Sequence, residues 1–341
     1  MLYRKISKMR TNVMKKILCS VLAMLMLVSA LSLISCDTQT EGDGKYTVGV
    51  VQLVQHVALD AATQGFIDTL KAELGEENVT ILNENASNDP NACTTIVNNF
   101  VSKKVDLIMA NATPALQAAA NGTTTIPVLG TSITEYGVAL GLKDFTGLVG
   151  GNVSGTSDLA PLDQQAKMIV DLYPDAEKVA LLYCSAEPNS KYQVEEIRRQ
   201  LVDLGLKDAN IKYFAFTDSN DVSTQAAAAS KFADVIYIPT DNTAASCAET
   251  INGVIGNTPV IAGEEGICSG CGVATLSISY YDLGVATGKM AAKILKGEAK
   301  IEEMKIEYAA TFTKKYNPER CEQLGVDVEA LKAAGYVAIG E

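Results

Sequence analysis

The sequence of 341 residues has one histidine and no tryptophan, and its bases are scarce. A single histidine, His56, excludes a histidine-rich metal site, and we expect neither a metal nor another cofactor. Lys and Arg number 28 against 40 Asp and Glu, for a formal charge of −12. We therefore expect no nucleic-acid partner, because binding a phosphate backbone needs clustered basic side chains. Beyond residue 35 the arginines are Arg198, Arg199 and Arg320, which disfavours phosphorylated or di-acidic ligands.

Hydrophobic residues are plentiful by contrast, at 48% of the chain, and charged residues make up 20%. Such a chain can bury a substantial core, and its length indicates about two domains.

The N-terminal segment has the layout of an export signal. Six bases precede an apolar stretch at 17–34, and no acid occurs before Asp37. The string Leu33-Ile34-Ser35-Cys36 resembles a lipobox, in which cleavage before Cys36 leaves a terminal cysteine that carries lipid. We expect residues 1–35 to be a signal peptide and 36–45 a lipid-anchored linker, which places the protein outside the cytoplasmic membrane of a bacterium. An uncleaved membrane anchor is the alternative.

Short apolar runs alternate with helical patterns, and the order restarts once. This alternation predicts an α/β fold with parallel sheets in two similar lobes. The expected strands are 46–51, 79–82, 105–109 and 127–130, then 178–183, 211–216, 234–238 and 259–262. The expected helices are 59–74, 91–101 and 115–120, then 194–204, 222–231 and 243–255.

Matched strand ends in the two lobes carry different chemistry. The first lobe has Thr113 and Ser132, which we expect near helix N-termini, and the second has Asp241 and Glu264. Ligands bind beyond the carboxyl ends of parallel strands, so these side chains should face one interlobe cleft. Hydroxyls and N–H groups suit a carboxylate, and carboxylates suit an ammonium. The pattern predicts an amino acid-like ligand; the alternative is that all four residues are ordinary helix caps.

Six cysteines lie beyond Cys36, and two of them form a C-x-x-C. Cys268 and Cys271 are expected in a glycine-rich loop, where free thiols, a local disulfide, a metal site and a redox pair all remain open. No second C-x-x-C or nearby histidine supplies the other ligands of a zinc site.

Enzyme signatures are weak in this sequence. There is no G-x-S-x-G string, and no G-x-G-x-x-G follows the first strand. We therefore expect no catalytic residues. A cleft enzyme that uses Asp241 and Glu264 is an alternative, and so is a lipid-anchored sensor coupled to a membrane receptor.

Several motifs occur in the order found in one family of transport proteins. The chain resembles ABC-transporter substrate-binding lipoproteins of the tryptophan/tyrosine (aromatic amino acid) binding family. The matching motifs are Gly49-Val-Val-Gln-Leu-Val-Gln-His56, Asn111-Ala-Thr-Pro-Ala-Leu-Gln117, Gly155-Thr-Ser-Asp158, Ile238-Pro-Thr-Asp-Asn-Thr243, Tyr280-Tyr-Asp-Leu-Gly284 and Gly288-Lys-Met-Ala-Ala-Lys-Ile-Leu-Lys-Gly-Glu298. They span nearly all of the sequence beyond the signal.

The resemblance implies a type I periplasmic-binding fold: two Rossmann-like lobes, a hinge of three crossing strands, and a ligand closed between the lobes. The implied first lobe is 46–156 plus 283–311, and the second is 157–282 plus 312–341. It also implies a monomer that delivers its ligand to an ABC permease with a cytoplasmic ATPase.

The resemblance also implies roles for individual residues. Thr113 and Ser132 would take the ligand carboxylate and Asp241 the ammonium. The opposite wall would be lined by Ser185, Glu187, Asn189 and Ser190. His56 is either a ligand contact or a structural residue, and the same choice applies to Tyr136, Tyr192, Tyr280 and Tyr281 as walls of a side-chain pocket. Departures such as Val57, where relatives often have proline, leave the ligand's side chain open between aromatic and branched.

Overall fold

The computed structural model describes residues 46–340, so the expected signal peptide, Cys36 and the linker lie outside the described residues. Among the residues that it describes, none of the helices combines the length and apolar character needed to cross a membrane.

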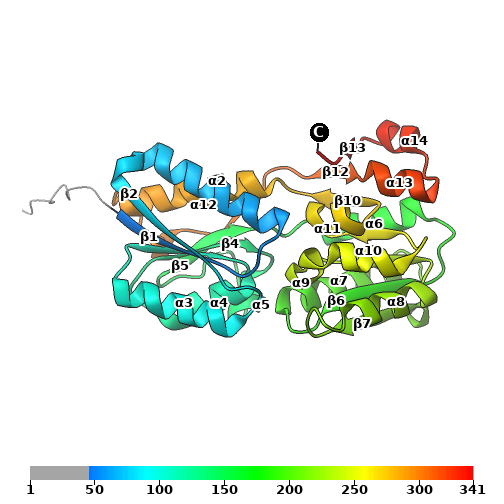
Figure 1. The fold of residues 1–341 in the computed structure, drawn as a ribbon, viewed down its shortest axis with the longest axis horizontal. Helices are drawn as coiled ribbons and strands as arrows, with labels where there is room; N and C mark the ends of the chain where they lie inside the picture. Colours follow the sequence, from blue (N-terminus) through cyan, green and yellow to red (C-terminus); the bar gives the residue numbers. More distant parts are fainter. Residues whose placement is uncertain (1–45, 341) are drawn as a thin grey trace, which may run out of the picture. The chain divides into compact units, whose positions relative to one another are not determined.

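Residues 46–157, together with residues 280–308 from later in the chain, build a six-stranded sheet and are called the first half of the molecule here (Figure 1). Its strand order is β11-β5-β4-β3-β1-β2, and each strand pairs with its neighbours in parallel. The strands are β1 (Tyr46–Gln52), β2 (Val79–Asn85), β3 (Leu107–Asn111), β4 (Val128–Ile133), β5 (Val153–Ser157) and β11 (Glu307–Tyr308). The helices of this half are α2 (Val57–Leu74), α3 (Pro90–Lys103), α4 (Thr113–Gly122), α5 (Tyr136–Leu140) and α12 (Tyr280–Leu295), with short turns η1 (Glu76–Asn78) and η3 (Ile301–Glu303).

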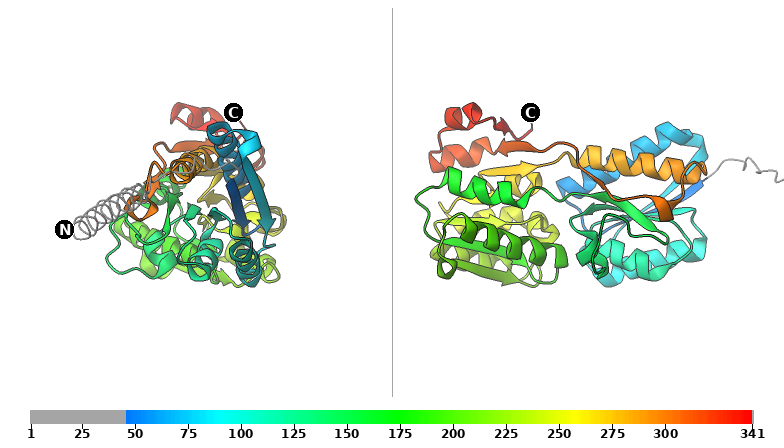
Figure 2. Two further views of the ribbon diagram at one scale, coloured as in Figure 1. Left: turned by 90° about the vertical axis from the view of Figure 1, so that its left-hand side faces the viewer. Right: turned by 180° about the vertical axis from the view of Figure 1, so that it is seen from behind.

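Alternation along the strands explains why helices cover both faces of this sheet. In β1, Val48 and Val50 pack with Phe66 of α2 and Met290 of α12, whereas Val51 belongs to the cluster on the α3 and α4 side. Figure 2 shows α12 beside α2, although more than 200 residues separate these helices in the sequence.

Glycines allow this close approach of α2 and α12. A Cβ at Gly65 would overlap the carbonyl oxygen of Tyr281, and a Cβ at Gly284 would overlap that of Ala62. The pair of glycines therefore lets the two helix backbones touch.

The second half builds a seven-stranded sheet in the order β13-β12-β10-β9-β8-β6-β7, in which β10 and β12 are antiparallel. Its strands are β6 (Val179–Cys184), β7 (Ile211–Phe216), β8 (Val235–Ile238), β9 (Val260–Ala262), β10 (Ala274–Ser277), β12 (Thr313–Tyr316) and β13 (Val337–Ala338). Its helices are α6 (Leu162–Leu172), α7 (Pro188–Asp203), α8 (Val222–Phe232), α9 (Asn242–Ser246), α10 (Ala248–Ile255), α11 (Glu265–Cys271), α13 (Pro318–Leu324) and α14 (Val328–Ala333), with the turn η2 (Asp208–Asn210).

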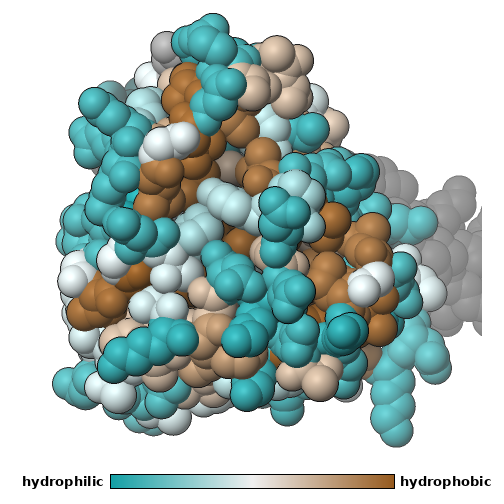
Figure 3. All heavy atoms as spheres, turned by 90° about the vertical axis from the view of Figure 1, so that its right-hand side faces the viewer, coloured by the Kyte–Doolittle hydropathy of each residue, from teal (hydrophilic) through white to brown (hydrophobic). Residues whose placement is uncertain are grey.

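The chain passes between the two sheets three times: after β5, after β10 and after β11. Hydrophobic clusters fill both faces of the second sheet as well, with α6 and α7 on one side and α8, α10 and α11 on the other. Large apolar side chains that stay exposed, such as Val202 and Val337, are scattered, and Figure 3 shows hydrophobic patches among hydrophilic ones on one face.

Two local expectations are wrong. The stretch 243–255 is two helices rather than one, because the backbone leaves helical geometry at Cys247, between α9 and α10. The C-x-x-C lies in α11 rather than in a loop, and its cysteines pack in the core as free thiols. Burial raises the pKa of Cys271 to about 12, which disfavours the reactive thiolate.

Candidate functional site

Residues from both halves of the molecule line one small polar cavity. Its volume is about 10 Å³, enough for roughly one water molecule. The lining residues are His56, Leu59, Ser132, Thr134, Asp158, Asn189, Thr240, Asp241, Asn242, Ala245, Glu264 and Tyr280.

Two of the acidic residues that line the cavity cap the N-termini of helices. Asp241 caps α9: one oxygen accepts from the N–H of Ala244 (2.8 Å) and the other from the N–H of Cys184 (2.6 Å). Glu264 caps α11 and accepts from the N–H groups of Gly266 and Ile267. Both residues are thus helix caps and cavity walls at once, so the two interpretations of these residues are compatible.

A third lining carboxylate, Asp158, follows β5 directly. One oxygen accepts from the Tyr280 hydroxyl at 2.9 Å, which ties the first crossing of the chain to the second. The other oxygen, Oδ1, is buried without a hydrogen-bond partner. The residue occurs in one of the family motifs, but nothing in its spacing predicted a place in the site.

Other buried polar atoms around this cavity lack partners too. They are the Ser132 hydroxyl, the Asn189 side-chain oxygen and Nδ1 of His56. Buried polar groups are normally paired, so four such atoms around one cavity indicate a place where a polar ligand completes the bonding.

Ser132 has an unusual backbone. It lies within β4 with φ of 56°, a left-handed conformation that is rare for a residue with a side chain. The expectation that Ser132 sits near a helix N-terminus is wrong, because α5 begins only at Tyr136. Thr113 is buried in the first turn of α4, as expected, but does not line the cavity.

The predicted opposite wall is only partly at the cavity. Asn189 lines it, whereas Ser185, Glu187 and Ser190 do not. Glu187 instead bonds to the start of α9: it accepts from the N–H and side-chain groups of Asn242 (3.0 and 2.7 Å) and of Thr243 (2.8 and 2.8 Å). The Ser185 hydroxyl donates to the Phe216 carbonyl at 3.0 Å.

Of the tyrosines, Tyr280 lines the cavity. Tyr136 lies in the core of the first half, where its hydroxyl donates to the carbonyls of Gly130 and Thr156 at 3.0 and 3.1 Å. Tyr281 is exposed, donates to Asp68 and does not line the cavity.

Contacts between residues of the two halves lie beside the cavity. Nε2 of His56 is 3.4 Å from the side-chain oxygen of Asn242, and the Asn88 amide donates to the Thr243 hydroxyl at 3.1 Å. Burial lowers the pKa of His56, which favours the neutral ring.

Burial also shifts the acids. It raises the pKa of Asp158 to about 6 and that of Glu264 to about 7, against the opposing effect of their hydrogen bonds. The pKa of Asp241 is raised as well, first by burial and then by the nearby charge of Glu187. In the part of the chain that the structure describes, no group of three or more His, Cys, Asp or Glu side chains is placed to hold a metal ion.

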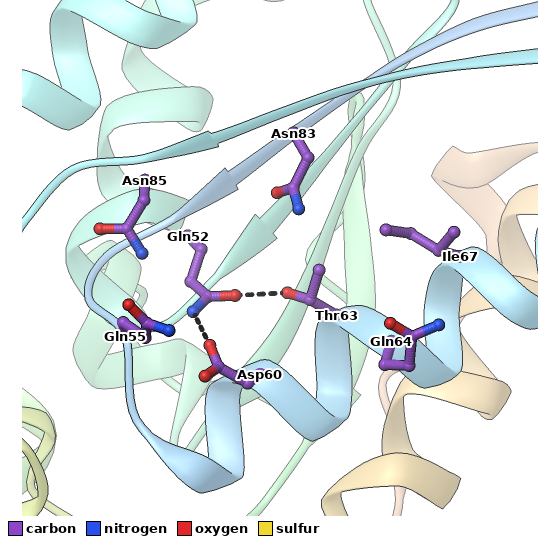
Figure 4. Close-up of a pocket in the computed structure, with 8 residues that line it drawn as sticks. All are labelled: Gln52, Gln55, Asp60, Thr63, Gln64, Ile67, Asn83 and Asn85. Atoms are coloured by element: carbon purple, nitrogen blue, oxygen red, sulfur yellow. Dashed lines mark hydrogen bonds between the residues drawn. The ribbon is translucent and has the colours of Figure 1, made fainter.

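A larger cavity of about 340 Å³ lies between β2 and α2 (Figure 4). Gln52 is fixed at its floor, since it donates to Asp60 at 2.7 Å and accepts from Thr63 at 2.6 Å. None of the predicted site residues lines this cavity.

The sequence matches a family model described as ABC transporter substrate binding protein over residues 47–336. The chain belongs to this family. Among curated proteins it is 35% identical over 268 residues to the tyrosine-binding protein of Clostridioides difficile, covering 77% of this chain and 76% of that protein.

Solved structures agree with this membership and with the type I periplasmic-binding fold. A domain from Streptococcus pneumoniae in complex with L-Trp superposes with a TM-score of 0.80 at 33% identity, over 86% of this chain and 100% of that one. The ligand-free, open structure of a substrate-binding protein with adhesive properties from Clostridium difficile gives a TM-score of 0.65 at 34% identity, over 86% and 99%. This member of the substrate-binding family thus superposes better on the ligand-bound relative.

Proposed function

We propose that this substrate-binding protein captures an aromatic amino acid in the polar cavity and hands it to an ABC importer. The observation that carries the proposal is the group of four unpartnered, buried polar atoms around one cavity, of which Asp158 Oδ1 and Ser132 Oγ are two. A zwitterion offers an ammonium and a carboxylate that would satisfy such atoms. The ligands in the names of two relatives, tyrosine and L-Trp, support the aromatic class.

The ligand's charged ends meet different groups in this proposal. The ammonium faces Asp158, Asp241 and Glu264, and the carboxylate faces the Ser132 hydroxyl. Thr113 is a less direct partner than expected, because it does not line the cavity. Tyr280 and Leu59 supply ring and aliphatic surface for the side chain, while Asn189 and His56 offer polar contacts.

The cavity is the closed form of an interlobe cleft in this proposal. At about 10 Å³ it is far smaller than the roughly 300 Å³ or more of a ligand pocket, so an amino acid enters only after the lobes separate. The lobes are 46–156 plus 283–311 and 157–282 plus 312–341. They move about the three crossings of the chain, and the ligand-bound form is the one that the permease reads.

Lipid on Cys36 completes the proposal, because it would hold the protein at the outer side of the cytoplasmic membrane. Mass spectrometry of the membrane-bound wild type should then find a chain that begins at a lipid-bearing Cys36, whereas a Cys36→Ser variant should carry no lipid. A wild type without lipid on Cys36 would remove the anchor from the proposal.

The ligand is tested on the protein as purified. Mass spectrometry of released small molecules, followed by a thermal-shift screen of the twenty amino acids, should identify tyrosine, tryptophan or phenylalanine. A ligand present at about 100 times its Kd stabilises the folded protein by about 2.7 kcal/mol. A screen in which no amino acid raises the Tm would refute the proposed ligand class.

A further inference from the structure

The cavity is lined by three acidic side chains and by no lysine or arginine. The acids are Asp158, Asp241 and Glu264, with exposed fractions of 3%, 1% and 2%. A volume of about 10 Å³ leaves little room for solvent to separate the charges. Burial around so small a space penalises the ionised form of all three carboxyls.

The groups behind the cavity do not supply a cation either. The nearby Glu187 raises the pKa of Asp241 through its charge. The charge of Asp60 likewise raises the pKa of His56, and that of Glu265 raises the pKa of Glu264. His56 is favoured in its neutral form by burial. Tyr280 donates its hydroxyl hydrogen to Asp158 but carries no charge.

A buried carboxyl without a cation is most cheaply accommodated by binding a proton. The three lining acids differ in this respect. Asp241 and Glu264 accept backbone N–H bonds on both oxygens, which stabilises their ionised form. Oδ1 of Asp158 forms no hydrogen bond, although the nearby Thr134 hydroxyl lowers the pKa of this carboxyl. Oδ1 is therefore the position that a proton or an ammonium would occupy.

We infer that capture of the amino acid at this site displaces a proton from the carboxyl cluster around Asp158 to solvent. The inference rests on the proposed function and concerns how the same site is regulated. The ligand's ammonium takes the place of the proton, so a neutral carboxyl becomes a carboxylate paired with an ammonium. One proton leaves for each ammonium accommodated, and no covalent bond of the ligand changes.

Proton displacement makes capture depend on pH. Near and below neutral pH the proton competes with the ligand, so affinity falls by up to about tenfold for each pH unit when a full proton is displaced. An aromatic amino acid keeps its own ammonium and carboxylate charges throughout this range, so the effect belongs to the protein. The raised pKa values of Asp158 and Glu264 put the transition at about 6 to about 7.

Isothermal titration calorimetry tests the inference directly. L-tyrosine and L-tryptophan are titrated into ligand-free protein in phosphate and in Bis-Tris near pH 6, where a carboxyl with a pKa of about 6 still holds a substantial fraction of a proton. The difference in measured enthalpy between the two buffers gives the number of protons released. We expect release of a substantial fraction of a proton by the wild type. Binding without proton release would overturn this inference and leave the proposed function standing, whereas absence of binding would overturn both.

Two variants test whether Asp158 is the group that releases the proton. Asp158→Asn should release fewer protons than the wild type, because an amide cannot exchange one. Asp163→Asn, an exposed position in the first turn of α6, removes the same charge and should match the wild type. Equal proton release by all three proteins would exclude Asp158 as the exchanging group. If Asp158→Asn does not bind, its ligand-free stability as a function of pH decides the same point.

Discussion

Replacing Asp158 by asparagine should change how stability depends on pH. Burial raises the pKa of this carboxyl from 3.8 to about 6. A shift of roughly two units corresponds to about 3 kcal/mol of unfavourable ionisation in the folded protein. The amide is neutral at every pH and keeps an oxygen for the Tyr280 hydroxyl, so it avoids this cost.

The sign follows from the direction of the shift. Because the folded pKa is raised, the contribution of Asp158 to stability is present below the unfolded pKa and is lost as pH rises through about 6. Between about pH 4.5 and about pH 8 the wild type should therefore lose about 2 kcal/mol relative to Asp158→Asn.

Urea unfolding of ligand-free protein at a series of pH values measures this difference. Asp163→Asn is the control, and its curve should run parallel to that of the wild type because Asp163 is exposed. A gap between Asp158→Asn and the wild type that stays constant with pH would show that Asp158 is ionised at little cost, and the reasoning would fail.

Two further substitutions test packing and capping by urea unfolding. Gly284→Ala should destabilise the protein by about 3 kcal/mol, because the new Cβ meets the backbone of α2, whereas Gly253→Ala in the exposed part of α10 should gain about 0.5–1 kcal/mol. Similar effects of the two changes would contradict the close contact of α2 with α12. Asp241→Ala should lose about 2–4 kcal/mol, since two buried N–H groups lose their acceptor, against about 1 kcal/mol for Asp327→Ala at the exposed cap of α14. Equal losses would mean that the N–H groups find other partners.

Much of the fold could be predicted because local patterns determine it. Apolar runs such as 46–51 and 178–183 form central strands, and strands of this kind are hydrophobic because helices cover both faces. Asp241 and Glu264 could be placed at the site for a related reason. Each follows a parallel strand, and the carboxyl ends of parallel strands gather at one edge of a sheet.

The rest of the site depends on contacts between distant parts of the chain. Asp158 and Tyr280 are 122 residues apart, and only the crossings between the sheets bring them together. Glu187 has the residue type of a ligand contact, yet the start of α9 takes up its oxygens. The glycines around Cys268 predict a loop, but the capping bonds of Glu264 begin a helix there. Composition and residue spacing do not predict these contacts, because the contacts depend on how the folded chain brings distant residues together.

The three crossings also affect the order in which the molecule can be completed during synthesis. The face of the first sheet that holds Val48 and Val50 is covered only by α2 until α12 has been made, and its edge strand β11 comes later still. The second sheet waits for β12 and β13 at the very end of the chain. From β6 until β11 a nascent chain therefore carries two unfinished sheets, and one truncation before residue 307 would deprive both of an edge.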